Sequence, residues 1–356
     1  MLTATIVGNR PQFVKAAAVS RKMRKTRDEL LIHTGQHYDD ELSQIFFDEL
    51  GIPAPDRQLD IHGGSNTEQT ARMLAALGPL LTEVDPQLVL VYGDTNSTLA
   101  GALAAAQLRV PLAHVEAGMR SFDRSMPEEL NRVLADHASD LLFCSTQTAV
   151  DNLAAENIRG GVHPVGDVMA DVALAFLPVA EERSMALEDS RVEPGDYVLM
   201  TVHRAGNVDP PERLERVVEL AERLPLPAVF PVHPRTRVRL RAAGLEQRLE
   251  AAVKLTQPLG YLDFLKLARH ALAILTDSGG VQKEAYLLGT PCVTLRASTE
   301  WVETVEQGWN VLVDLHVDAA LAALERPIPS AERRELYGGG RAADRICEVL
   351  DAYTGA

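Results

Sequence analysis

The sequence predicts an α/β protein made of two doubly wound parallel-sheet domains that face each other across a cleft. Three observations predict this fold class. Short apolar runs alternate with helical patterns through the first 165 residues, the alternation resumes near residue 197, and the 356-residue chain is longer than one hydrophobic core usually grows. Ligands of such sheets bind beyond the carboxyl ends of the strands, so we expect the functional site in the cleft.

The first domain is expected over residues 1–170. Each apolar run in this part of the chain is short enough for a buried strand and is followed by a helical pattern. This order is typical of βαβ units, which build parallel sheets. The predicted strands are 5–7, 30–33, 88–92, 112–115, 141–144 and 162–165.

The second domain is expected over residues 171–335. A charged stretch between Pro178 and Pro194 interrupts the alternation, and we place the crossing between the domains near its start. The glycines at 338–340 then precede a last helix over 341–353, and this C-terminal segment, 336–356, is expected to pack back on the first domain. The predicted strands of the second domain are 197–201, 228–232, 253–255, 272–276 and 292–295.

The composition excludes several classes of protein. Hydrophobic residues make up 46% of the chain and charged residues 24%, as in a globular protein. No stretch is apolar enough to span a membrane, and the first residues read as a strand rather than a signal peptide, so we expect a cytoplasmic protein. A net charge of −15 argues against nucleic acid as a partner, and any anionic ligand must be held by a local basic cluster.

The cysteines point to packing rather than chemistry. Cys144, Cys292 and Cys347 are odd in number, far apart in sequence and mostly set in apolar runs, which argues against a disulfide framework. A metal site is also disfavoured, because neither His-x-x-x-His nor a tight Asp/His spacing occurs. We expect no metal.

The strongest phosphate signal is Thr-Asp-Ser-Gly-Gly at 276–280, which ends an apolar strand and begins a helix. Unpaired N–H groups and the helix dipole favour an anion there, the small Gly279 and Gly280 allow close approach, and Ser278 adds a hydroxyl. Glu284, farther along the helix, could accept hydrogen bonds from ribose. An ordinary helix cap with a tight turn and an exposed helical glutamate explain the same residues about equally well.

A second signal is Val-Gly-Asn-Arg-Pro-Gln-Phe-Val-Lys at 7–15. A strand ends near Gly8, and Pro11 suits the first turn of a helix. Arg10 and Lys15 could pair with a diphosphate from the start of this helix. Solvation at the surface explains Lys15 equally well.

A third constellation gathers acids and arginines after two predicted strands. Several carboxylates around one cleft are what proton transfer on two faces of a substrate requires. Helix-capping and an i,i+4 ion pair are alternative explanations for part of the set. Its members are Asp94, Glu116, Arg120, Glu128, Glu129 and Arg132.

Two histidines also follow predicted strands. His233 lies in Pro-Val-His-Pro and is interpreted as a hydrogen-bonded structural residue. His203 lies beside Arg204 at the expected mouth of the cleft, which favours a role with phosphate or in proton transfer.

These segments together resemble the non-hydrolysing UDP-N-acetylglucosamine 2-epimerases, whose two Rossmann-like domains form the glycosyltransferase-B (GT-B) architecture. The resemblance spans nearly the whole chain. It rests on Val-Gly-Asn-Arg-Pro, Thr-Gly-Gln-His at 34–37, Gly-Asp-Thr at 93–95, His-Val-Glu-Ala-Gly at 114–118, Pro-Glu-Glu with Asn131-Arg132, His203-Arg204, Pro-Val-His, and Thr-Asp-Ser-Gly-Gly with Glu284.

The resemblance implies inversion at C2 of a UDP-linked N-acetylhexosamine without any cofactor. UDP is eliminated to leave a 2-acetamidoglucal and then adds back, while the C2 proton is delivered to the opposite face. Position by position, the resemblance makes Asp94, Glu116, Glu128 and His203 catalytic. It assigns the phosphates and nearby sugar to Arg10, Lys15, Arg132, Ser278, Gly279 and Gly280, the ribose to Glu284, and the surroundings of uracil to residues 257–264. It also implies a homodimer and a closing motion of the domains.

The sequence departs from many family members at four places. Here they read Asn9-Arg10-Pro11-Gln12, Tyr38, His203-Arg204-Ala205-Gly206 and Thr299-Glu300-Trp301-Val302. These spellings, with Leu-Asp-Ile-His-Gly-Gly at 59–64, are similar to the branch that acts on UDP-2,3-diacetamido-2,3-dideoxy-glucuronate, which remains an alternative substrate. They also put activation by a second UDP-N-acetylglucosamine in doubt. A UDP-sugar glycosyltransferase of the same fold, a hydrolysing relative and a non-catalytic UDP-sugar sensor are further alternatives.

Overall fold

The computed structural model describes residues 1–36, 54–329 and 332–353. Within it the chain forms two compact units. Unit 1 comprises Met1–Val172 and Glu335–Ala356, and unit 2 comprises Ala173–Arg334. The boundaries expected from the sequence are 170 and 335. His37 and Tyr38, which contribute to the family resemblance, lie outside the described residues, as do the last three residues of the C-terminal segment.

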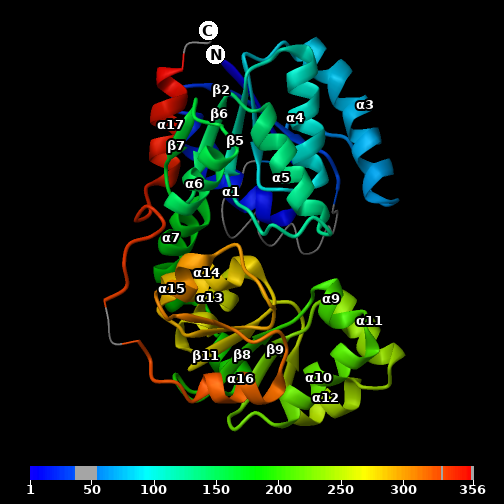
Figure 1. Ribbon diagram of the computed structural model, residues 1–356, viewed down its shortest axis with the longest axis vertical. Helices are drawn as coiled ribbons and strands as arrows, with labels where there is room; N and C mark the ends of the chain where they lie inside the picture. The colour runs from blue at the N-terminus through cyan, green and yellow to red at the C-terminus, as the bar shows by residue number, and fades with distance from the viewer. Residues whose placement is uncertain (37–53, 330–331, 354–356) are drawn as a thin grey trace. The chain divides into compact units, whose positions relative to one another are not determined.

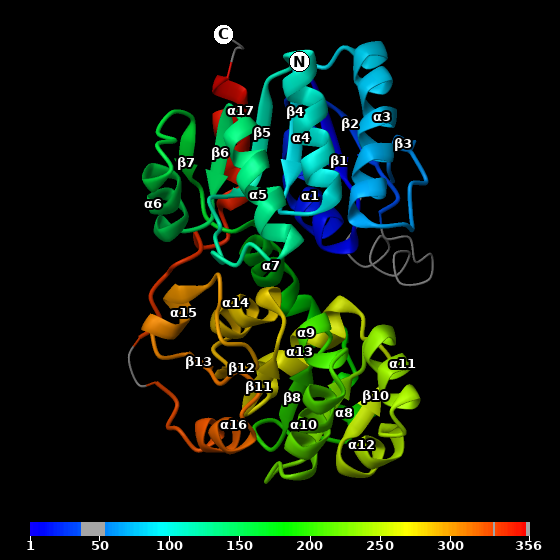
Figure 2. The ribbon, with the colours of Figure 1, turned by 45° about the vertical axis from the view of Figure 1, so that its right-hand side comes forward.

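Unit 1 is built on a seven-stranded sheet in the order β3-β2-β1-β4-β5-β6-β7, and all of its strand pairings are parallel. Figures 1 and 2 show α3, α4 and α5 on one face of this sheet and α1 and α17 on the other. The strands are β1 (Leu2–Val7), β2 (Asp28–His33), β3 (Arg57–Gln58), β4 (Leu88–Tyr92), β5 (Leu112–Ala117), β6 (Leu141–Cys144) and β7 (Val162–Pro164). The helices are α1 (Arg10–Met23), α3 (Asn66–Val84), α4 (Asn96–Leu108), α5 (Pro127–Ala138), α6 (Gln147–Ala155) and α17 (Ala342–Ala352), and α7 (Val168–Arg183) begins in unit 1.

The central strand and helix of unit 1 follow directly from residue size and polarity. All five residues of β4 are apolar or aromatic and fully buried, as expected for a strand covered on both faces. Helix α4 packs close to this strand because it consists largely of alanine and glycine. A Cβ at Gly101 would lie 3.0 Å from both Ile6 and Val91. Thr95 and Thr98 form a capping box that fixes where α4 begins, immediately after Asp94.

Unit 2 repeats the design with a six-stranded sheet in the order β10-β9-β8-β11-β12-β13, whose pairings are also parallel. Its core packs strand residues such as Met200, Phe230 and Leu275 against the helices. The strands are β8 (Val198–Thr201), β9 (Ala228–Pro231), β10 (Lys254–Thr256), β11 (Ala273–Thr276), β12 (Cys292–Thr294) and β13 (Asn310–Leu312). The helices are α8 (Ala186–Ser190), α9 (Ala205–Val208), α10 (Pro211–Glu222), α11 (Pro234–Ala242), α12 (Glu246–Ala252), α13 (Tyr261–His270), α14 (Gly279–Leu288), α15 (Val302–Glu306) and α16 (Val317–Leu324).

The C-terminal helix α17 lies against α1 in unit 1 (Figure 1). Asp171 accepts hydrogen bonds from the backbone N–H groups of Ala342 and Ala343 at 3.0 and 2.7 Å and so caps the start of α17. Arg27 donates to Asp351 at 3.0 Å near the other end. Both ends of the helix are therefore fixed by polar contacts to elements of unit 1.

The cysteines are free thiols. Burial raises the pKa of Cys144 and Cys292 to about 12 and that of Cys347 to about 11, so the thiols stay protonated and unreactive at neutral pH. Within the described part of the chain, no group of histidine, cysteine and carboxylate side chains is arranged to hold a metal ion. None of the described helices is long and apolar enough to cross a lipid bilayer.

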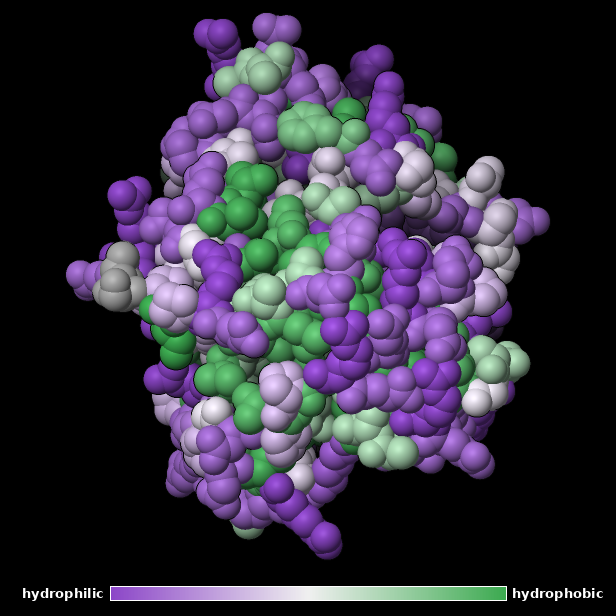
Figure 3. Space-filling model, turned by 60° about the horizontal axis from the view of Figure 1, so that its bottom comes forward, coloured by the Kyte–Doolittle hydropathy of each residue, from purple (hydrophilic) through white to green (hydrophobic). Residues whose placement is uncertain are grey.

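Apolar side chains gather in one patch of the surface shown in Figure 3. Unit 2 also carries a small apolar groove at the starts of β11 and β12, lined among others by Leu272, Pro291, Trp309 and Ile328. Its volume of about 40 Å³ is far below the several hundred Å³ that a nucleotide-sized ligand fills. A nucleotide sugar therefore does not fit this groove.

Candidate active site

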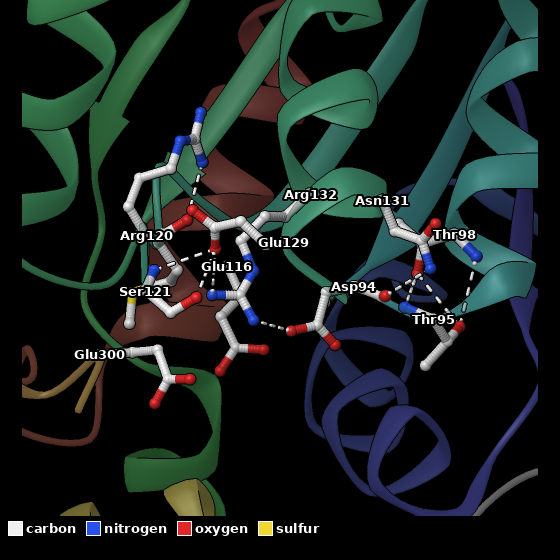
Figure 4. Close-up of polar contacts among 12 residues, drawn as sticks. Asp94, Thr95, Thr98, Glu116, Arg120, Ser121, Glu129, Asn131, Arg132 and Glu300 are labelled. Atoms are coloured by element: carbon white, nitrogen blue, oxygen red, sulfur yellow. Dashed lines mark hydrogen bonds and ion pairs between the residues drawn. The ribbon is translucent and has the colours of Figure 1, made fainter. Parts of the chain in front are cut away.

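The carboxylates expected after β4 and β5 lie in one group on unit 1, together with two basic side chains. We call this group the acid cluster, and Figure 4 labels all of its members except Lys15. Arg132 of α5 donates to Asp94 at 2.5 Å and to Glu129 at 3.2 Å, and Lys15 of α1 forms an ion pair with Glu116. The members of the acid cluster are Lys15, Asp94, Glu116, Glu129 and Arg132.

The acid cluster combines burial with access. The side chains of Arg132 and Glu129 are only 5% and 6% exposed, whereas Asp94 keeps 35% of its side-chain area exposed. Side-chain amides hold the backbone of the loop that carries Asp94. Asn131 donates to the Asp94 carbonyl at 2.9 Å, and Gln12 of α1 donates to the Tyr92 carbonyl at 2.6 Å. Asp94 is therefore a solvent-reachable carboxylate on a rigid support.

Glu116 sits in a strained backbone conformation. Its φ of +74° is left-handed, and the pairing of β5 with β6 shifts register between Val115 and Ala117. A non-glycine residue in this region costs free energy, and such bulges commonly re-aim a side chain beside a functional site. Here the bulge brings the Glu116 carboxylate to Lys15 and next to Gly93.

The backbone conformation and close surroundings at position 93 explain why a glycine precedes Asp94. The φ of Gly93 is +61°, and a Cβ there would lie 3.3 Å from the Glu116 carboxylate and 3.5 Å from the Lys15 ammonium. The ends of β4 and β5 are hydrogen-bonded neighbours, and Gly93 donates to the Val115 carbonyl at 2.9 Å. The bare backbone of Gly93 thus leaves room for the Lys15–Glu116 pair.

The two neighbouring glutamates of α5 behave differently. Glu129 is buried and accepts from the backbone N–H groups of Ser121 and Phe122, each at 2.9 Å, so it anchors the loop before α5. Glu128 is half-buried, and no hydrogen bond or ion pair joins its carboxylate to another described residue. Among the sequence-predicted acids, Glu128 is therefore the one not tied into the acid cluster.

Two other basic residues predicted for this region, Arg120 and Arg10, are not members of the acid cluster. Arg120 points into a separate buried network, where it pairs with Asp136 and Glu156. Arg10 is the first residue of α1, which Asn9 caps through the Gln12 N–H, but its side chain lies outside what the structure describes.

On unit 2, Asp277 organises the loop that follows β8. This fully buried carboxylate accepts from the backbone N–H groups of His203 and Arg204 at 3.1 and 2.9 Å, and from the Asn207 amide at 3.1 Å. The ring of His203 lies 3.4 Å from the same carboxylate, measured from Nδ1. Asp277, inside the Thr-Asp-Ser-Gly-Gly motif, therefore positions His203.

His203 is set up to be neutral at physiological pH. Desolvation lowers its pKa below the ordinary value, and the positive charges of Arg204 and Arg235 lower it further, whereas Asp277 acts in the opposite direction. Its ring lies 5.6 Å from that of His233, which caps α11 by accepting from the Arg235 N–H at 3.2 Å. A structural role for His233 agrees with that cap.

Helix α14 begins at the predicted phosphate motif. Ser278 is its N-cap, and its side chain makes no capping bond, so the hydroxyl is available to a ligand. Gly280 has open space where a Cβ would stand. The corresponding position at Gly279 lies 3.6 Å from the Glu300 carboxylate and from the Trp301 ring nitrogen, and 3.9 Å from the Arg204 guanidinium. The first N–H groups of a helix have no intrahelical partner, so this end of α14 can bind an anion.

Glu284 lies one turn into α14 and is buried. Tyr261, the first residue of α13, donates its hydroxyl to Glu284 at 3.2 Å. This bond joins the predicted ribose residue to the segment 257–264 that the resemblance assigns to uracil.

Three residues that shape these arrangements, Asn131, Asp277 and Tyr261, lie in motifs or segments singled out from the sequence but received no individual role there. Asp277 lies within the Thr-Asp-Ser-Gly-Gly motif, whose glycines and serine drew the interpretation as a phosphate site. Asn131 directly precedes Arg132, which was expected to bind phosphate or sugar. Nothing in the spacing between Tyr261 and Glu284 signals their contact, because it depends on how α13 packs beside α14.

Comparisons with known proteins assign the family. A family model described as UDP-N-acetylglucosamine 2-epimerase matches residues 21–351. A UDP-N-acetylglucosamine 2-epimerase homolog of Methanococcus maripaludis is 49% identical, with 98% of this chain and 99% of the relative aligned. The UDP-2,3-diacetamido-2,3-dideoxy-D-glucuronate 2-epimerase of Pseudomonas aeruginosa is 48% identical over the same shares of the two chains.

A solved structure confirms the predicted fold class of two Rossmann-like, parallel-sheet domains. The UDP-GlcNAc 2-epimerase of Methanocaldococcus jannaschii, in complex with UDP-GlcNAc and UDP, matches with a TM-score of 0.92 at 42% identity, covering 99% of this chain and 100% of that one. Together these matches confirm the resemblance on which the sequence interpretation depended: the chain belongs to the UDP-N-acetylglucosamine 2-epimerase family of isomerases.

Proposed function

We propose that this protein interconverts UDP-N-acetylglucosamine and UDP-N-acetylmannosamine by eliminating UDP and adding it back through 2-acetamidoglucal. The observation that carries the proposal is the acid cluster, in which Asp94 and Glu116 extend from adjacent strand ends and each pairs with a cation. Epimerisation at C2 requires groups that remove a proton and return one, and carboxylates held in this way suit that chemistry.

The proposed roles follow from each environment. Asp94 and Glu116 exchange the C2 proton, and Glu128, whose carboxylate is not tied to other described residues, assists them. Arg132 and Lys15, within the acid cluster, also offset negative charge near the sugar and phosphates. His203, whose pKa is lowered, takes up or orients a proton as a neutral imidazole.

UDP is the leaving group, and its departure is assisted by whatever stabilises a diphosphate. We propose the start of α14 for this role, with Ser278, Gly279 and Gly280 contacting the phosphates and Arg10 contributing a further positive charge. Glu284 would accept from the ribose, with Tyr261 holding its carboxylate in place. No cofactor is needed, because elimination and re-addition leave the sugar's oxidation state unchanged.

A second substrate has support of its own. The Pseudomonas aeruginosa relative, whose name specifies a diacetamido-glucuronate, is 48% identical, about as similar as the 49% identical homolog. The variant spellings at 203–206 and 299–302 favour the same branch. The chemistry at C2 is shared, so this alternative changes the substrate and leaves the mechanism as proposed.

Incubating the purified protein separately with the two UDP-sugars and identifying the products by chromatography and mass spectrometry tests the proposal. We expect a UDP-linked C2 epimer from one or both. Free N-acetylmannosamine with UDP would indicate a hydrolysing relative instead. If neither UDP-sugar gives an epimer but its sugar is transferred once an acceptor is added, the epimerase assignment is wrong and the glycosyltransferase is favoured.

We also propose that the protein works as a homodimer in the cytoplasm, as the sequence analysis expects. Light scattering on the purified protein should give twice the 38.8 kDa mass of one chain. A mass of one chain at micromolar concentration would contradict the dimer.

A further inference from the structure

We infer that His114 is a positioning residue for the acid cluster: it donates both ring N–H groups and thereby locks together the backbone segments that carry Asp94 and Glu116. The inference rests on the proposed function for its catalytic consequence. Its structural half, the doubly protonated ring, stands on the geometry of unit 1 alone.

His114 is fully buried in the middle of β5, and each ring nitrogen has a close partner. Nδ1 lies 2.7 Å from the Asp136 carboxylate on α5, and Nε2 lies 2.7 Å from the carbonyl oxygen of Gly93 at the end of β4. Both distances are those of strong hydrogen bonds. The ring therefore bridges a helix and the neighbouring strand.

Both partners of the ring are acceptors. A backbone carbonyl has no hydrogen to donate. The second oxygen of Asp136 already accepts from the Gly118 N–H at 3.0 Å and from Arg120 at 2.7 Å. Burial raises the pKa of Asp136, but the hydrogen bonds and charges of His114 and Arg120 outweigh it and hold that pKa below its usual value, so this carboxylate is ionised and also accepts.

A neutral imidazole has only one N–H and would set a nitrogen lone pair against an oxygen at 2.7 Å on its other side. The imidazolium satisfies both acceptors. It also balances the charge of the buried network, in which two cations, His114 and Arg120, alternate with two anions, Asp136 and Glu156. A buried charge needs such pairing to persist.

The network contacts the backbone beside Asp94 and Glu116, two of the three acids of the cluster, without contacting their carboxylates. Gly93 immediately precedes Asp94, and Gly118 follows Glu116 by two residues. Both glycines have left-handed φ values, +61° and +77°, so these turns rely on the bonds that hold them. Because His114 and Asp136 join the two turns, a change in the ring shifts the spacing of the two carboxylates.

The experiment replaces His114 by glutamine, whose amide can donate to one of the two acceptors but cannot reproduce the bridging ring. The matched control is His137→Gln, since His137 is the next residue of α5 after Asp136, is 48% exposed and bonds only the outer carboxylate of Glu156 among the described residues. For each protein we would measure kcat and KM with the UDP-sugar that the wild type converts, and the Kd for UDP.

We expect His114→Gln to lower kcat by about 100-fold, the size of effect that a misplacement of about 1 Å produces, with Kd for UDP changed less than about threefold. His137→Gln should match the wild type. If folded His114→Gln, shown by its UDP binding, keeps the kcat of the wild type, the positioning role is wrong. A wild type that converts no UDP-sugar would instead refute the proposed function.

The ring itself is tested on the unaltered protein, so the outcome does not depend on whether the variant folds. In a sample with ¹⁵N-labelled histidine, we expect two slowly exchanging N–H signals from the His114 ring at pH 7, assigned by their absence from the spectrum of His114→Gln or, if that variant does not fold, of His114→Asn. A single N–H signal would show a neutral ring and overturn the inference.

Discussion

Asp94 is the residue on which the proposed chemistry depends most. Replacing it by asparagine keeps the shape of the side chain and an acceptor for Arg132, but removes the basic carboxylate. We expect turnover to fall by about 100-fold or more, the contribution typical of a general base, while UDP binding stays near that of the wild type. Kinetics and calorimetry with UDP measure the two effects.

Asp151→Asn is the control, because Asp151 is exposed on α6 and bonds only Gln147 among the described residues. It should behave as the wild type. If Asp94→Asn loses turnover and UDP binding together, Asp94 acts in binding or folding and its catalytic assignment fails.

His203 sets the pH dependence that we expect. Its pKa is lowered from the ordinary value of 6.5, mainly by desolvation, so the neutral ring dominates at pH 7 and the midpoint of its protonation lies below pH 6.5. If the neutral form is required, kcat/KM holds through neutral pH and falls as the solution becomes more acidic. A profile of kcat/KM against pH should show this limb in the wild type and lose it in His203→Asn.

Two results would contradict this assignment. One is a limb that lies above pH 6.5, which would require a raised rather than a lowered pKa. The other is an acidic limb that persists unchanged in His203→Asn, which would assign the titration to another group.

At the residue scale, the sequence predicts which side chains lie near the end of a strand when an apolar run is followed directly by a polar motif. The sequence places Asp94 and Glu116 just past their strands. The structure confirms this for Asp94, whereas Glu116 lies inside β5 at its bulge, and both belong to one group. Glu128 and Glu129 show the limit. The sequence offers two adjacent glutamates, and which of them turns inward depends on the rotation of α5, which buries Glu129. Periodicity alone does not determine that rotation at the first turn of a helix.

At the scale of elements, the turn after β5 depends on Gly118. Its φ is +77°, and a Cβ there would lie 2.3 Å from the Ala149 carbonyl oxygen, closer than real contacts allow. Gly118→Ala should lower the free energy of unfolding by more than about 1 kcal/mol, because the left-handed backbone and the overlap both oppose the methyl group. Urea unfolding followed by fluorescence or circular dichroism measures the change.

Gly160→Ala is the matched control, since its backbone is not left-handed and nothing lies within 4 Å of the added Cβ. It should be neutral or slightly stabilising. Equal stability of the two alanine variants would show that the turn relaxes around the methyl group and that the described geometry is not obligatory.

The cap of α17 gives a second prediction for an element. Asp171 accepts from two backbone N–H groups at the start of this helix. Asp171→Ala should cost about 1–2 kcal/mol of stability, as loss of an N-cap does. Asp344→Ala, which removes only the half-exposed partner of Lys22, should cost about 0.5 kcal/mol or less.

Urea unfolding compares the two variants of α17 with the wild type. If Asp171→Ala is no less stable than Asp344→Ala, the cap does not hold the helix in solution.

The elements themselves were largely predictable, because buried parallel strands are short apolar runs between helical patterns. All six strands expected in unit 1 form, and the additional strand β3 was missed. Its two residues, Arg57 and Gln58, are exposed and polar, and only their pairing with β2 makes them a strand. The bulge at Glu116 was also beyond prediction, because it arises from the register of β5 against β6.

At the scale of the whole molecule, each of the two sheets supports a different group of candidate functional residues. Unit 1 carries the acid cluster, and unit 2 carries a helix start suited to a diphosphate together with a neutral histidine. Each set lies at the carboxyl ends of parallel strands, where α/β proteins bind ligands. Under the proposed function, both sets serve one reaction, epimerisation at C2 of a UDP-sugar.

The most direct test of this account follows the reaction in deuterated water by proton NMR, with UDP-N-acetylglucosamine and, separately, the diacetamido-glucuronate analogue. The account predicts that the C2 proton signal of the substrate disappears and that a UDP-linked C2 epimer carrying deuterium at C2 appears. Epimer that retains its original C2 proton would contradict proton exchange at the acid cluster, and the absence of any epimer from both substrates would contradict the assigned reaction.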